Sequence, residues 1–176
     1  MKAFKKYIWL CLILAIACLS PSLSKATMEV PLQLAQNYST AETEVGWLWP
    51  VPTSRTITSL FGNRNIALYG FERMHTGIDI HAATDVDVLA TQSGTVLVST
   101  FDNGWGHYII VNHGDNIVSL YAHLNARTVK RGESVTRGQV IGKVGNTGFS
   151  EAPHLHFELR ESGKPINPFR FTYEDK

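Results

Sequence analysis

Two histidines lie two residues apart near the C-terminal end of the chain, in the apolar, strand-like segment Pro153–Glu158. Residues i and i+2 of a β-strand point to the same face, so the Cα atoms of His154 and His156 are expected about 6.6 Å apart. Two imidazoles at that spacing can converge on one metal ion, or one can bind the ion while the other transfers protons beside it. The same pattern also fits two histidines on a half-buried strand without a metal.

His75 and Asp79 form a second candidate cluster. A fully extended chain would place their Cα atoms about 13 Å apart, too far for both side chains to reach one ion. The chain must therefore bend between them, and Gly77 permits such a bend. A neutral imidazole and a carboxylate are both good ligands for zinc. Taken alone, the pair also fits an ion pair on a surface loop.

The third element is His123, which ends a strand-like run that begins at Ile117. On its own it is more typical of a strand-end histidine than of a catalytic one. Both cysteines, Cys11 and Cys18, precede residue 27, so a chain processed there would have no thiolate for a metal. A metal site would then use His, Asp and Glu, and all seven histidines lie between residues 75 and 156.

These clusters, in this order, resemble the lysostaphin-type zinc metallopeptidases, which are secreted endopeptidases of bacterial cell-wall peptidoglycan. The motifs are His75-x-x-x-Asp79, Tyr121-x-His123-Leu124 and the segment Pro153–Glu158. Three motifs in the right order are far more specific than any one of them, and the resemblance covers about residues 47–170. It implies that His75, Asp79 and His156 are the zinc ligands, with the catalytic residues His123 and His154 flanking the open coordination position.

The resemblance implies hydrolysis of an amide bond without a covalent intermediate. Zinc would lower the pKa of its bound water and polarise the scissile carbonyl. One of His123 and His154 would take the proton from the attacking water, and the other would hydrogen-bond the developing oxyanion; the sequence leaves both assignments open. The bond cleaved could be a glycine cross-bridge or a D-amino-acid cross-link.

The alternative is a non-catalytic relative that binds peptidoglycan or activates a separate hydrolase. Such relatives typically lack one or more metal ligands, whereas this chain carries all three ligands and both auxiliary histidines. An active enzyme is therefore the favoured hypothesis.

Four further residues have two interpretations each. His81 lies where family members usually have small residues; it could contact substrate, but a strand-end histidine is favoured. His107 and His113 bracket a strand and are interpreted as structural. Glu158 alternates with the two histidines of its strand, so it either orients a ligand histidine or lies in solvent.

The elements that must position these residues are predicted to be strands. No 12-residue window shows clear helical periodicity, and glycine-containing turns recur between short apolar runs. We expect strands over 56–61, 77–80, 87–90, 94–99, 140–144 and 154–160, a hairpin over 107–123, and a loop over 63–73. The predicted fold is all-β, a small antiparallel β-sheet domain with little or no helix. The resemblance adds an open groove holding the zinc site.

Residues 1–26 are predicted to be a secretory signal peptide. Lysines at positions 2, 5 and 6 precede an apolar run over 7–19 that is too short to span a bilayer comfortably. Ser24 and Ala26 supply the small residues for cleavage before Thr27. A retained membrane anchor and a lipoprotein attached at Cys18 are the alternatives. Export would place the chain in the periplasm, the cell envelope or the extracellular space.

The remaining chain is predicted to comprise an N-terminal arm (27–46), a peptidase domain (47–170) and a tail (171–176). Beyond residue 26 it has 12 basic and 15 acidic residues, which does not favour a nucleic-acid-binding surface. The expected partners are peptidoglycan stem peptides or cross-bridges, and no stable membrane span is expected in the mature chain.

Overall fold

The computed structural model describes residues 46–66, 71–171 and 173–174. The predicted signal peptide, the alternative lipid attachment site at Cys18 and almost all of the predicted N-terminal arm lie outside these residues. Among the described residues, no helix is long and apolar enough to cross a membrane.

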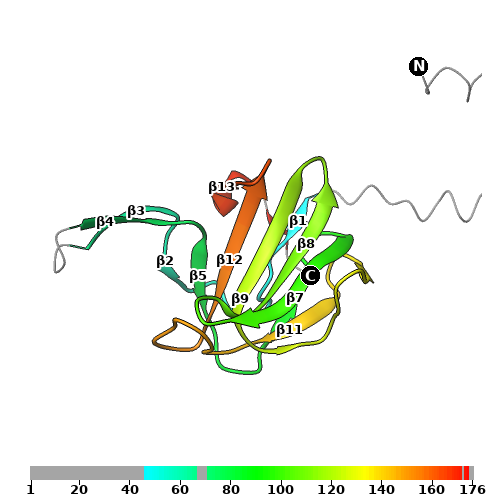
Figure 1. Ribbon diagram of the computed structural model, residues 1–176, viewed down its shortest axis with the longest axis horizontal. Helices are drawn as coiled ribbons and strands as arrows, with labels where there is room; N and C mark the ends of the chain where they lie inside the picture. Colours follow the sequence, from blue (N-terminus) through cyan, green and yellow to red (C-terminus); the bar gives the residue numbers. More distant parts are fainter. Residues whose placement is uncertain (1–45, 67–70, 172, 175–176) are drawn as a thin grey trace, which may run out of the picture. The chain divides into compact units, whose positions relative to one another are not determined.

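All strand pairs of the largest sheet in the described part of the chain are antiparallel, as the turn-rich sequence predicts. Its strands are β2 (Ile57–Ser59), β5 (Ile78–His81), β6 (Asp87–Leu89), β7 (Gly94–Asp102), β8 (Gly106–Gly114), β9 (Ile117–Arg127), β10 (Ser134–Val135), β11 (Val140–Val144), β12 (His154–Glu161) and β13 (Lys164–Ile166). Their order is β10-β7-β8-β9-β12-β5-β2, with β11 beside β6 and β9, and β13 beside β12 (Figure 1). The all-β prediction is confirmed.

Two small sheets and one short helix complete the described part of the chain. Strand β1 (Trp47–Leu48) pairs in parallel with β14 (Tyr173–Glu174), which joins the two ends of the domain. The 3-10 helix η1 (Pro168–Arg170) precedes β14. The described residues contain no α-helix.

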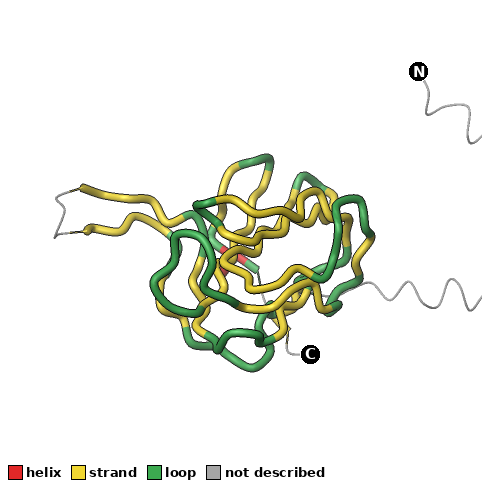
Figure 2. The backbone as a smooth tube through the Cα atoms, turned by 60° about the horizontal axis from the view of Figure 1, so that its bottom comes forward, coloured by secondary structure: helices red, strands yellow, loops and turns green. Residues whose placement is uncertain are grey.

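The third sheet is a hairpin that the sequence did not predict. Residues 63–73 were expected to form a loop, but β3 (Gly62–Ile66) pairs with β4 (Phe71–His75). The hairpin extends away from the main sheet (Figure 2), so its strands can pair without an alternation of polar and apolar residues. Because that alternation is the sequence signal for a strand, the sequence did not indicate this hairpin. It ends at His75 and so delivers that side chain to the main sheet.

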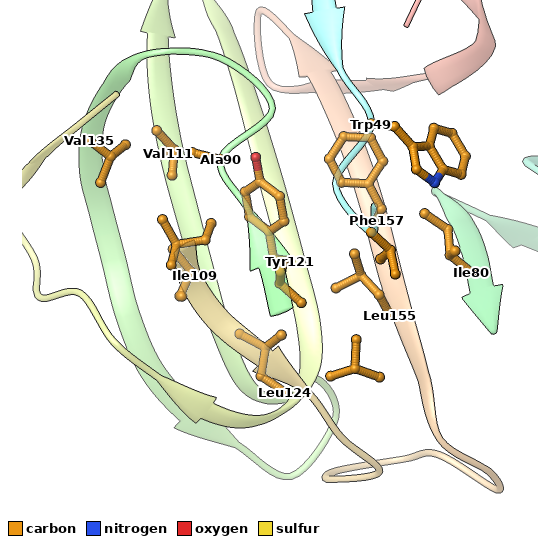
Figure 3. Close-up of a cluster of buried hydrophobic side chains, with 14 of the residues drawn as sticks. Trp49, Ile80, Ala90, Ile109, Val111, Tyr121, Leu124, Val135, Leu155 and Phe157 are labelled. Atoms are coloured by element: carbon orange, nitrogen blue, oxygen red, sulfur yellow. The ribbon is translucent and has the colours of Figure 1, made fainter. Parts of the chain in front are cut away.

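The core is formed by the apolar residues that face inward from the main sheet (Figure 3). It includes fully buried side chains of β8, β9 and β12, among them Ile109, Tyr121, Leu155 and Phe157. Full burial of such a side chain stabilises the fold by about 1.5–3 kcal/mol. The core side chains of β9 and β12 therefore hold in place the strands that carry the candidate site.

A chain of hydrogen bonds crosses this core. The Thr91 amide donates to the Tyr121 hydroxyl at 2.9 Å, and the Ser119 hydroxyl lies 2.9 Å from the same oxygen. His113 Nε2 lies 2.7 Å from Ser119 Oγ, and its Nδ1–H donates to the Ser93 carbonyl at 2.9 Å. Tyr121 and Ser119 are fully buried, so their hydroxyl groups need these hydrogen-bond partners.

We expect Tyr121→Phe to destabilise the protein by about 1–3 kcal/mol, because the buried Thr91 amide would lose its acceptor. Urea unfolding measures this change. Tyr108→Phe is the matched control, because the half-buried Tyr108 hydroxyl has no hydrogen-bond partner among the described residues, and it should change stability by less than about 0.5 kcal/mol. Equal losses in the two variants would contradict a structural role for this chain of hydrogen bonds.

Candidate metal centre and groove

Strand register brings the candidate ligands together from distant parts of the sequence. On the antiparallel pair β5–β12, Asp79 lies opposite His156 and His81 opposite His154. His75 ends β4 only three residues before β5 begins. A Cβ at Gly77 would lie 2.3 Å from the Phe157 carbonyl oxygen, so glycine is required where this connection passes against β12. Gly77 therefore serves close approach to β12 as well as the expected bend.

Three side-chain atoms converge on one point. His75 Nε2 lies 3.1 Å from Asp79 Oδ1 and 3.1 Å from His156 Nδ1, and the last two atoms are 2.8 Å apart. In a tetrahedral zinc site with bonds of about 2.1 Å, ligand atoms are about 3.4 Å apart. The triangle has nearly this size, and these three residues form a group that could hold a metal ion.

The opposite nitrogen of each histidine is fixed by an acceptor. His75 Nδ1–H donates to the Leu60 carbonyl at 2.8 Å, and His156 Nε2–H donates to Glu158 Oε1 at 3.0 Å. These bonds select the tautomers in which His75 Nε2 and His156 Nδ1 carry lone pairs. Two imidazole lone pairs and a carboxylate thus point at the same position, which is a donor set suited to zinc.

Glu158 is fully buried and holds three partners. Besides His156, it accepts hydrogen bonds from Thr76 Oγ1 and, at 2.6 Å, from Arg160 Nε. Burial by itself would raise the pKa of Glu158, but the hydrogen bonds from His156, Arg160 and Thr76 lower it below its usual value. Of the two interpretations offered by the sequence, a carboxylate in solvent is wrong, and Glu158 contacts a candidate ligand directly.

His123 approaches the same point from β9 through an irregularity in that strand. Its φ of 61° is left-handed, and the β8–β9 register shifts between the pairs Ile109–Tyr121 and His107–Leu124. This bulge costs about 1–2 kcal/mol of backbone strain and redirects the side chain. The His123 ring lies 4.8 Å from the ring of His154 and 5.9 Å from that of His156, between centroids.

The two auxiliary histidines both face the centre with Nε2. His123 Nδ1–H donates to the Thr147 carbonyl at 2.8 Å, and His154 Nδ1–H donates to the Ala152 carbonyl at 2.8 Å. His154 Nε2 lies 3.7 Å from Asp79 Oδ1. All five site residues proposed from the sequence therefore meet in one place.

Burial and charge set the protonation of this cluster. Burial lowers the pKa of His123 to about 4, and the charges of His154 and His156 add to that effect, so His123 is neutral at pH 7. Burial would raise the pKa of Asp79, but its close contacts with the His156 and His75 ring nitrogens hold that pKa well below its usual range. The centre therefore combines a carboxylate with at least one neutral imidazole able to accept a proton.

The cluster lies in a groove of about 840 Å³. Its lining includes Met74, His81, Trp105 and Phe149. Phe149 is 75% exposed and Met74 is 44% exposed, so both apolar side chains are open to a ligand. His81 therefore lies at the groove as well as at a strand end, whereas His107 packs edge-on against Phe101 outside it.

The groove of this antiparallel β-domain contains two histidines and one carboxylate, with two further histidines beside them. This arrangement is suited to metal-assisted hydrolysis. Residues 73–168 match the sequence profile of Peptidase family M23, and the chain belongs to this family.

The chain is also similar to individual proteins, in sequence and in structure. The chain is 40% identical over 112 residues to the DD-carboxypeptidase/endopeptidase Mpg of Neisseria meningitidis serogroup B, a match that covers 64% of this chain and 26% of that protein. Its structure is similar to that of a zinc containing peptidase from Vibrio cholerae, with a TM-score of 0.69, 31% identity, and coverage of 73% of this chain and 41% of the other. The catalytic domain of the antimicrobial peptidase lysostaphin from Staphylococcus simulans gives a TM-score of 0.59 and 30% identity over 65% of this chain and 90% of that domain.

Proposed function

We propose that this chain is a zinc metalloendopeptidase that hydrolyses peptide cross-links of bacterial peptidoglycan. The observation that carries the proposal is the convergence of His75 Nε2, Asp79 Oδ1 and His156 Nδ1 beside His123 and His154 in an open groove. The names of two similar proteins, a DD-carboxypeptidase/endopeptidase and a zinc containing peptidase, agree with it. They also favour a D-amino-acid cross-link over a glycine bridge, and a place of action in the cell envelope.

In this proposal His75, Asp79 and His156 hold the metal. Bound Zn²⁺ would lower the pKa of a coordinated water towards neutrality and polarise the scissile carbonyl. His123 and His154 expose lone pairs at Nε2, so either can accept the proton of the attacking water. Once protonated, the same nitrogen becomes a donor, to the oxyanion or to the leaving amine. The Thr147 and Ala152 carbonyls keep the two rings oriented throughout.

Two measurements on the purified chain test the proposal: zinc content and clearance of a suspension of purified cell walls. An endopeptidase binds about one zinc and clears the suspension, and a chelator stops the clearance. Stoichiometric zinc without clearance would favour the non-catalytic alternative, a relative that binds peptidoglycan or activates another hydrolase.

Glu158→Gln is expected to weaken zinc binding about 10–100-fold, because a neutral amide replaces the carboxylate that orients His156. Competition with a chromogenic chelator measures this affinity. Glu161→Gln is the matched control, since Glu161 is exposed, lies on the same strand and has a carboxylate that bonds Arg170 at 3.3 Å. Equal zinc affinity in the two variants would contradict an orienting role for Glu158.

A further inference from the structure

Arg160 continues the row of side chains that begins with the candidate site on β12. His156, Glu158 and Arg160 alternate along the strand and so share one face, with the Cα of Arg160 about 13 Å from that of His156. Arg160 Nε donates to Glu158 Oε2 at 2.6 Å, while the other oxygen of Glu158 contacts His156 and Thr76. Arg160 is therefore anchored to the same carboxylate as the candidate ligand.

An aromatic ring holds the other side of this guanidinium. The Arg160 Cζ atom lies 5.5 Å from the centroid of the Trp105 ring, within the range of a cation–π contact. Trp105 is itself fixed, because its carbonyl accepts the His123 amide at 2.8 Å and its ring packs edge-on against Tyr108. Trp105 lines the groove, so the Arg160 guanidinium, which lies over the Trp105 ring, is next to the groove.

The guanidinium still has unused donors. Among the described residues, the side chain of Arg160 bonds only Glu158, and it does so through Nε, which leaves the edge formed by Nη1 and Nη2 without a protein acceptor. The side chain is 26% exposed, so this edge can reach a ligand. Two parallel N–H groups match the two oxygens of a carboxylate. Because the side chain is already held on two sides, little conformational entropy is lost when it binds.

We propose that Arg160 is a specificity-determining residue that binds a free carboxylate of the substrate peptide beside the groove, next to Trp105. The proposal rests on the proposed peptidase function and defines the substrate further as peptides with an ionised carboxyl group several residues from the scissile amide. The hydrogen bond from Arg160 to Glu158 uses only the Nε–H group. The carboxylate site uses the remaining edge of the same guanidinium, so one arginine serves both contacts.

The test uses two cross-linked muropeptides that differ only in whether the stem-peptide carboxyl groups are free or amidated. The unmodified chain should prefer the free-carboxylate substrate in kcat/KM. Arg160→Gln should lower kcat/KM for that substrate about 10–100-fold, mainly through KM, and remove the preference. Arg170→Gln, which changes an exposed arginine bonded to Glu161, is the control and should keep the preference.

The substrate pair separates recognition from positioning. Equal losses on both substrates would overturn the proposal and assign Arg160 to positioning through Glu158, and no loss on either would also overturn it. If Arg160→Gln fails to fold, calorimetric binding of the two muropeptides to the unmodified chain decides, and equal affinities contradict the proposal. Hydrolysis of both substrates with equal kcat/KM refutes only the carboxylate site, whereas hydrolysis of neither refutes the peptidase function.

Discussion

The His156→Ala variant is expected to lose both zinc and peptidoglycan hydrolysis. The change removes one of three ligand atoms, and it also leaves Glu158 buried without its partner Nε2–H. Loss of a residue that only orients a ligand histidine weakens metal binding about 10–100-fold, so loss of the ligand itself should exceed that range. Zinc content after dialysis and release of muropeptides are the two measurements.

His107→Gln is the matched control for this variant. His107 lies outside the groove and packs against Phe101, so its replacement should preserve zinc and turnover. A His156→Ala protein that keeps stoichiometric zinc would remove His156 from the ligand set. Equal loss of zinc in the control would point to general destabilisation instead.

The His123→Ala variant is expected to keep its zinc and lose turnover. His123 is separated from the ligand triangle but faces it, and its removal deletes a proton acceptor or oxyanion donor. Loss of such a group lowers kcat by about 10²–10⁴-fold. The variant removes none of the three proposed ligand atoms, so zinc affinity should stay within a few-fold of the unmodified chain.

The His123→Ala variant is also expected to change how the stability of the fold depends on pH. Because burial lowers the pKa of His123 to about 4, the unfolded chain binds a proton there before the folded chain does. The neutral ring therefore supports the fold fully above its ordinary pKa near 6.5, and this support is lost as pH falls from about 6.5 to about 4. His123→Ala should flatten the dependence of folding stability on pH in that window.

Full turnover by His123→Ala, or loss of its zinc, would contradict the catalytic assignment of His123.

The sequence predicted the strands of the site better than their pairing. Alternation along β12 correctly placed His154 and His156 on one face, because that period is local. Nothing local indicates that Asp79 lies opposite His156, since register depends on residues 77 positions apart. The choice of His156 over His154 as the ligand came from the family resemblance and remains a prediction.

Backbone features that position the side chains were outside the reach of sequence patterns. Nothing in the sequence indicates the left-handed φ of His123, because glycine is the residue that usually marks such a position. The carbonyls of Leu60 and Thr147 select histidine tautomers regardless of their own side chains. The β3–β4 hairpin was missed for a similar reason, since its pairing needs no apolar alternation.

Mass spectrometry of muropeptides tests the central claim most directly. Cross-linked peptidoglycan is digested with the zinc-loaded chain, then with a muramidase, and the fragments are compared with those from His156→Ala. The proposed function predicts that cross-linked dimers disappear and monomers with one hydrolysed D-amino-acid linkage accumulate only with the unmodified chain. Unchanged dimers in the presence of stoichiometric zinc would contradict an endopeptidase.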